Sequence, residues 1–124
     1  MRPTNAAEYA ALIRESGLIS DDQLQASAVA FEQEHGCLEQ AEVRAFAEFL
    51  LNRELVTRWQ DGKLSAGRYK GFLLAEKYRL LDHLSIDGDA SNYLAVHLPT
   101  GRRVKIAISR HPDQGPPYTV TPWP

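Results

Sequence analysis

Few side chains in this 124-residue chain have the type and spacing that chemistry requires. His35 and Cys37 come nearest to a base and its nucleophile, but residues two apart in a loop seldom orient together, and no third group is evident beside them. A single cysteine cannot form an intrachain disulfide, and the four histidines show no metal-ligand spacing. We therefore predict no catalytic residue and no metal site, and we interpret Cys37 as structural or incidental.

Two further groups of polar residues have both a simple and a chemical interpretation. Four glutamates surround one predicted loop: Glu32, Glu34, Glu39 and Glu42. Such a cluster is more typical of a solvated surface than of a metal cage. His83 and His97 could meet across two strands, yet a histidine on a half-exposed sheet usually faces solvent. We assign no role to either group.

Charge and composition exclude several classes of protein. Fourteen basic and 16 acidic side chains give a net charge of -2, which argues against a nucleic-acid-coating or polybasic membrane-binding protein. The apolar runs fall far short of the roughly 18 residues that span a bilayer, and the first five residues have no apolar stretch behind their arginine. We therefore expect a folded cytoplasmic protein with no nucleic-acid partner and no membrane insertion.

The two halves of the chain differ in charge and in hydrophobic period. Residues 1–60 hold 5 basic and 10 acidic side chains, whereas residues 61–124 hold 9 and 6. Apolar residues recur every three or four positions in the first half and alternate in the second. This pattern predicts an α+β chain: a helical module over 1–67, a linker over 68–77, a β-sheet over 78–109 and a Pro-rich extended tail over 110–124.

The helical module is predicted to contain four helices. They are expected to begin near Asn5, Ser20, Glu39 and Thr57. A shift of 37 residues aligns Leu18–Ser20 with Leu55–Thr57, where an apolar pair precedes a hydroxyl N-cap. We interpret the module as two helix-turn-helix repeats. The alternative is that any two amphipathic helix pairs align to this extent.

A small antiparallel sheet of three strands is predicted after the linker. The strand-like segments are 78–84, 93–98 and 103–109, and Pro99–Arg102 has turn chemistry. In the third strand Val104, Ile106 and Ile108 share one face. Three strands with one apolar face are not stable alone, so we expect the helices or another chain to cover that face, and the third strand to be an open edge.

Two stretches of the chain resemble a known family. Tyr78–Leu84 and Tyr93–Val104 resemble the first three strands of the N-lobe of bacterial Ser/Thr protein kinases. Leu55–Gln60 and Gly67–Leu74 resemble the segment that precedes the kinase domain in many planctomycete kinases. The resemblance implies a bacterial protein whose sheet is a truncated kinase N-lobe.

The positions that a kinase uses to bind ATP are changed in this chain. The resemblance places Ser85, Asp87 and Ala90 where the three loop glycines belong, and Ala107 where the catalytic lysine belongs. Lys105 lies on the same strand face, displaced by about 6.6 Å at the usual rise per residue. The partner helix and the catalytic and metal-binding loops of a kinase are also missing from the sequence. We therefore expect no kinase activity, no cofactor and no ATP binding.

These observations favour a non-catalytic protein-interaction or adaptor module, or a small subunit of a larger complex, that binds another protein or itself. The alternatives are a regulatory domain that binds a nucleotide or small ligand without turnover through Lys105 or Arg103, an unrelated enzyme, and a remnant without function. The tail is interpreted either as a docking peptide or as a disordered segment. The candidate partner-binding residues, of which the first two could instead be core, are Trp59, Phe72, Val104, Ile106, Ile108, Tyr118 and Trp123.

Overall fold

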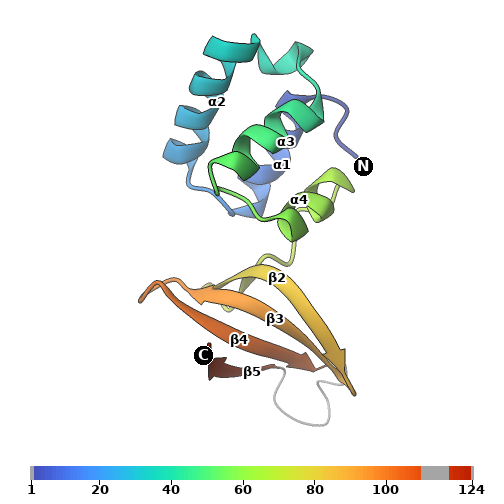
Figure 1. The fold of residues 1–124 in the computed structure, drawn as a ribbon, viewed down its shortest axis with the longest axis vertical. Helices are drawn as coiled ribbons and strands as arrows, with labels where there is room; N and C mark the ends of the chain where they lie inside the picture. Colours follow the sequence, from blue (N-terminus) through green and yellow to red (C-terminus); the bar gives the residue numbers. More distant parts are fainter. Residues whose placement is uncertain (1, 110–117, 124) are drawn as a thin grey trace. The chain divides into compact units, whose positions relative to one another are not determined.

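The computed structural model describes residues 2–109 and 118–123, and it has four α-helices followed by an antiparallel sheet (Figure 1). The predicted α+β class and the four helices are confirmed. The prediction of three strands is wrong, because the sheet has five strands in the order β1-β2-β3-β4-β5. The chain divides into two compact units, residues 1–72 and 73–124, and each is described by itself.

The boundaries of the helices follow their caps. The helices are α1 Ala6–Ser16, α2 Asp21–His35, α3 Val43–Asn52 and α4 Arg58–Ser65, with a short 3-10 helix at Leu38–Gln40. The Ser20 and Thr57 side chains accept hydrogen bonds from the third backbone N–H of α2 and α4. Thr57 and Gln60 also form a reciprocal capping box. The third helix begins at Val43 rather than near Glu39, because the 3-10 turn occupies that stretch.

An aromatic cluster forms the centre of the helical unit. Phe31 packs against Phe46 and Phe49 with ring centroids 5.1 and 5.5 Å apart, and Tyr9 packs edge-on against Phe46 at 6.3 Å. Phe31, Phe46 and Tyr9 are completely buried. Such contacts add to the burial of apolar area, which is the main stabilising term in folding.

The sheet is a simple meander in which each strand pairs with the next. Its strands are β1 Leu73–Leu74, β2 Tyr78–Asp87, β3 Ala90–His97, β4 Arg102–Ser109 and β5 Tyr118–Pro122. A two-residue turn joins β2 to β3, and its first residue, Gly88, has φ +63°, which favours glycine. β2 is bulged after Leu80 and after His83. β1 lies in the segment predicted as linker, and β5 lies in the predicted tail, of which 110–117 and 124 are outside the described residues.

The register of the strands sorts their side chains onto two faces. We call one of them the tyrosine face, and we call a set of cross-strand partners on it a row. Its rows are, in order, Tyr78, His97 and Arg102; Leu80, Ala95, Val104 and Pro122; Tyr93, Ile106 and Val120; and Ser91, Ile108 and Tyr118. We call the other the lysine face. Its rows are Arg79, Val96 and Arg103; Leu94, Lys105 and Thr121; and Ser85, Asn92, Ala107 and Thr119. Val104, Ile106 and Ile108 thus share a face, as alternation requires.

Candidate partner-binding site

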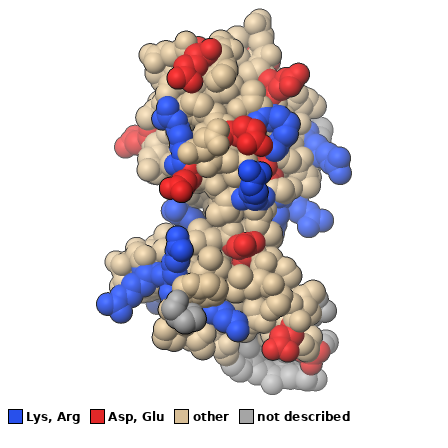
Figure 2. All heavy atoms as spheres, in the orientation of Figure 1, with Lys and Arg blue, Asp and Glu red and all other residues tan. Residues whose placement is uncertain are grey.

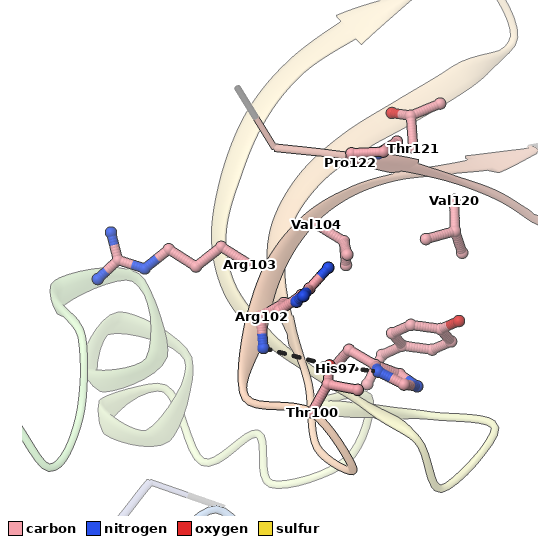
Figure 3. A pocket seen from close by; sticks show the side chains of 9 residues that line it. His97, Thr100, Arg102, Arg103, Val104, Val120, Thr121 and Pro122 are labelled. Atoms are coloured by element: carbon pink, nitrogen blue, oxygen red, sulfur yellow. Dashed lines mark hydrogen bonds between the residues drawn. The ribbon is translucent and has the colours of Figure 1, made fainter.

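A pocket of about 410 Å³ lies on the tyrosine face, beside the turn between β3 and β4 and the end of β5 (Figure 3). Its lining comes from four strands and one turn: Tyr78, His97, Thr100, Arg102, Arg103, Val104, Val120, Thr121 and Pro122. This volume is within the range of sites that bind small molecules or single side chains of a partner. The register explains its composition, since Val104 and Pro122 are cross-strand partners next to the row of Tyr78, His97 and Arg102.

Aromatic rings form one wall of the pocket. The rings of Tyr78 and His97 lie 5.2 Å apart, and Tyr118 approaches Tyr78 edge-on at 6.3 Å. The Nδ1 atom of His97 is 2.7 Å from the Thr100 hydroxyl, which also accepts a long bond from the Arg102 backbone N–H. The β3–β4 turn therefore orients the imidazole.

Two neighbouring arginines differ in their relation to the pocket. Arg102 lies on the tyrosine face and its guanidinium points among the lining residues, whereas the Arg103 side chain extends away from them (Figure 3). Both residues are exposed. The pocket therefore combines an apolar wall with one cationic group, which suits an anionic group attached to an apolar body.

The charges of the sheet unit are separated along the strands. The end that carries the pocket holds Lys77, Arg79, Arg102 and Arg103 against Glu76, while the β2–β3 hairpin at the other end holds Asp87 and Asp89. In Figure 2 the basic side chains of this unit lie towards its left and acidic ones towards its lower right. Within the sheet unit, the charged residues near the pocket are therefore mainly basic, which favours negatively charged groups there.

The outer edge of β5 offers backbone groups to a partner. Within the residues that the structure describes, β5 pairs only with β4. The Trp123 N–H donates to the Arg103 carbonyl at 3.4 Å, so by alternation Thr119 and Thr121 also turn their backbone groups towards β4. Val120 then presents its N–H and C=O outward. Pro122, which has no N–H, lies at an outward position where a sheet tolerates proline.

The structure distributes the predicted partner-binding residues among different environments. Val104 lines the pocket, Tyr118 and Ile108 are half-buried neighbours on the tyrosine face, and Trp123 is 38% exposed. Ile106 is completely buried, and so is not accessible to a partner.

The two predicted anchors of the helical unit belong to its core. Phe72 is 1% exposed and joins the main apolar cluster, and the half-buried Trp59 packs edge-on against it at 5.8 Å. The Lys63 ammonium lies 4.9 Å from the Trp59 ring centre, and burial lowers the pKa of Lys63, with a further contribution from Arg68. Of the two interpretations, core packing accounts for these contacts.

The positions that the kinase resemblance singles out meet on the lysine face. Asn92 is a cross-strand partner of Ala107, and its side-chain amide donates to the Ser85 hydroxyl at 3.1 Å. Asp87 and Ala90 pair directly across the two-residue turn. The β2–β3 hairpin therefore has a short turn, and the hydrogen bond between Asn92 and Ser85 links its two strands.

Other polar residues have structural partners. The His35 ring stacks on Phe31 at 4.6 Å, and the Glu32 carboxylate accepts the Leu38 N–H at 3.0 Å. Register pairs His83 with Tyr93 and His97 with Tyr78, so the two histidines lie in different rows. In residues 2–109 and 118–123 no three His, Cys, Asp or Glu side chains are grouped to hold a metal ion, and no helix is long and apolar enough to cross a membrane.

An ionic cluster around the buried Asp61 in the helical unit was not anticipated from the sequence. One carboxylate oxygen of Asp61 accepts hydrogen bonds from the Tyr9 hydroxyl at 2.7 Å, the Arg44 guanidinium at 2.6 Å and the Ser65 hydroxyl at 3.0 Å. Burial tends to raise the pKa of Asp61, but these three donors outweigh it and the pKa is lowered. Burial and the neighbouring Asp61 raise the pKa of Tyr9. The cluster joins α1, α3 and α4 through these three hydrogen bonds.

No protein-family model, curated protein or solved structure matches the chain.

Proposed function

We propose that this chain is a non-catalytic protein-interaction module and that its sheet unit binds the partner. The observation that carries the proposal is the position of the exposed apolar side chains. Seven large apolar residues are exposed in the described chain, and six of them belong to the sheet unit: Leu73, Leu84, Ile86, Leu98, Val120 and Trp123. Of these, Val120 lies on β5 and Trp123 directly follows it, so both are beside the outward edge that strand addition uses.

A kinase-like origin of the sheet is part of the proposal. β2, β3 and β4 form an antiparallel meander over the same residues that resemble the first three N-lobe strands. The strands keep an apolar pattern, whereas the loop glycines and the lysine are replaced. Selection for packing without selection for phosphoryl transfer accounts for both facts.

A protein partner is better supported than a nucleotide. Lys105 and Arg103, which would have to hold phosphates, share the lysine face with Ala107 and the Ser85–Asn92 pair. Asp87 and Asp89 add carboxylates at the hairpin, where they repel phosphate groups. By contrast, the Val120 edge and the pocket favour a peptide backbone with its side chains.

The proposal is tested by capture of proteins from a native extract with the tagged chain and two matched variants. Val120→Asp introduces a charge at the β5 edge, and Val29→Asp introduces the same charge at an exposed site of α2. We expect a stoichiometric partner that Val120→Asp loses and Val29→Asp keeps, with both variants folded by circular dichroism. Light scattering shows whether that partner is a second copy of the chain.

Two results would contradict the proposal. One is a monodisperse monomer that captures nothing in stoichiometric amount. The other is a thermal stabilisation by ATP or ADP that the Lys105→Ala variant abolishes, which would support the nucleotide-binding alternative.

A further inference from the structure

We infer that the partner segment is an extended acidic peptide, which adds to the β5 edge, places an apolar side chain in the pocket and pairs a carboxylate with Arg102. This inference rests on the proposed function and specifies its ligand. Three observations carry it: the outward backbone groups of β5, the composition of the pocket and the charge around it.

The β5 edge dictates an extended backbone. The Val120 N–H and C=O point away from β4, so a strand beside β5 forms its first pair of hydrogen bonds with this residue. Alternate side chains of that strand then fall on the tyrosine face, next to Val120 and Pro122. These two residues also line the pocket, so a peptide that pairs with the edge places a side chain of that face beside the pocket.

The lining and the volume of the pocket favour a large apolar side chain of the peptide. Val104, Val120, Pro122 and the Tyr78 ring form an apolar lining, and a volume of about 410 Å³ accommodates a side chain of the size of leucine or phenylalanine with room for a neighbouring group. Burial of such a side chain on an aromatic wall is the usual source of affinity at a peptide-binding site.

The basic residues around the pocket favour an acidic peptide residue near the apolar side chain. Arg102 points into the pocket, and no carboxylate of the described residues forms a salt bridge with it. Lys77, Arg79 and Arg103 surround the same end of the sheet. A carboxylate two residues from the apolar side chain lies on the same face of the added strand, where it meets the Arg102 guanidinium in a charge-assisted hydrogen bond. The ligand pattern is therefore an acidic and an apolar residue at positions i and i+2.

The experiment selects peptides from a random seven-residue library displayed on phage, with the immobilised full chain as the target. Enriched peptides are synthesised with a fluorescent label, and their dissociation constants are measured by fluorescence anisotropy. Arg102→Ala and Lys105→Ala are a matched pair, because both remove one exposed cationic side chain from β4, on opposite faces, and only Arg102 lines the pocket. N-methylation of successive peptide amides tests backbone pairing without any change in the protein.

We expect the enriched peptides to share an acidic and an apolar residue at i and i+2. Their binding should weaken at least about tenfold with Arg102→Ala and less than about twofold with Lys105→Ala. N-methylation should abolish binding at alternate positions only.

Enriched peptides without acidic residues, or an equal loss with Arg102→Ala and Lys105→Ala, would overturn the acidic-peptide inference and leave the interaction module standing. The inference also fails if no peptide is enriched. In that case the capture experiment with Val120→Asp decides separately whether the chain is an interaction module.

Discussion

Removal of one hydroxyl tests whether the ionic cluster holds the helical unit together. Tyr9→Phe keeps the buried ring and deletes only the donor that reaches Asp61 at 2.7 Å. Tyr9 is completely buried, so no water replaces the lost bond. A hydrogen bond to a charged group contributes about 1.5–3 kcal/mol, and we expect the free energy of unfolding to fall by about 2 kcal/mol. For a unit of this size the midpoint temperature then falls by roughly 8–16 °C.

The pH dependence of this loss identifies its cause. Asp61 has a lowered pKa in the folded state, so its stabilising contribution is fully present above the unfolded value of about 3.9 and is lost as the pH falls through the folded pKa. Once the carboxyl group is protonated, the Tyr9 bond is an ordinary neutral one of about 1 kcal/mol. The difference between wild type and Tyr9→Phe should therefore be constant from pH 5 to 7 and should shrink below about pH 3.9.

The assay is urea unfolding followed by circular dichroism at 222 nm, which reports on the helices. Tyr69→Phe is the control, since Tyr69 is half-buried in the same unit and no hydrogen bond from its hydroxyl is seen. If both variants unfold at the same urea concentration, the cluster does not stabilise the unit. If the loss in Tyr9→Phe stays the same as the pH falls through the titration of Asp61 in the folded state, the charge of Asp61 is not its source.

Three further substitutions test the backbone and the caps, each by urea unfolding against wild type. Gly62→Ala should stabilise the helical unit by up to about 1 kcal/mol, because Gly62 is inside α4 and an added Cβ meets nothing within 4 Å. Gly88→Ala should destabilise the sheet unit by about 1 kcal/mol, because φ at this residue is +63°, although the added Cβ also meets nothing within 4 Å. An unchanged unfolding midpoint would show that the turn adopts another conformation. Thr57→Ala should cost about 1 kcal/mol by loss of the capping box, and a change below about 0.3 kcal/mol would contradict that role.

The parts of the fold that depend on neighbouring residues could be predicted from the sequence. Ser20 and Thr57 indicated helix starts because an N-cap acts on the next three residues. The alternation of Val104, Ile106 and Ile108 indicated a strand with one apolar face for the same reason. The start of the third helix was misplaced because a 3-10 turn and a helix share their local preferences over Leu38–Gln40.

The features that depend on distant residues could not be predicted. β5 pairs with β4 although residues 110–117 lie between them in the sequence, and the prolines of the segment 110–124 indicated a tail rather than a strand. The Asp61 cluster unites side chains from positions 9, 44, 61 and 65, and only packing of the helices brings them together.

The pocket was missed because its membership depends on register. Tyr78, His97 and Arg102 become neighbours only when three strands are aligned, and the two bulges in β2 change which residues share a row. The binding residues predicted from the sequence were instead mostly apolar ones, and two of them, Ile106 and Phe72, are buried.

The sheet unit separates the residues that stabilise it from those that are offered to a partner. Leu80, Ala95 and Ile106 are buried in the middle of the tyrosine face, whereas Arg102, Val120 and Trp123 are exposed around the pocket and the β5 edge. Substitutions in the second group should therefore change binding with little effect on folding, because exposed side chains contribute little to stability. This separation makes the matched pairs of variants informative, since a loss of binding in a folded variant can be assigned to the surface itself.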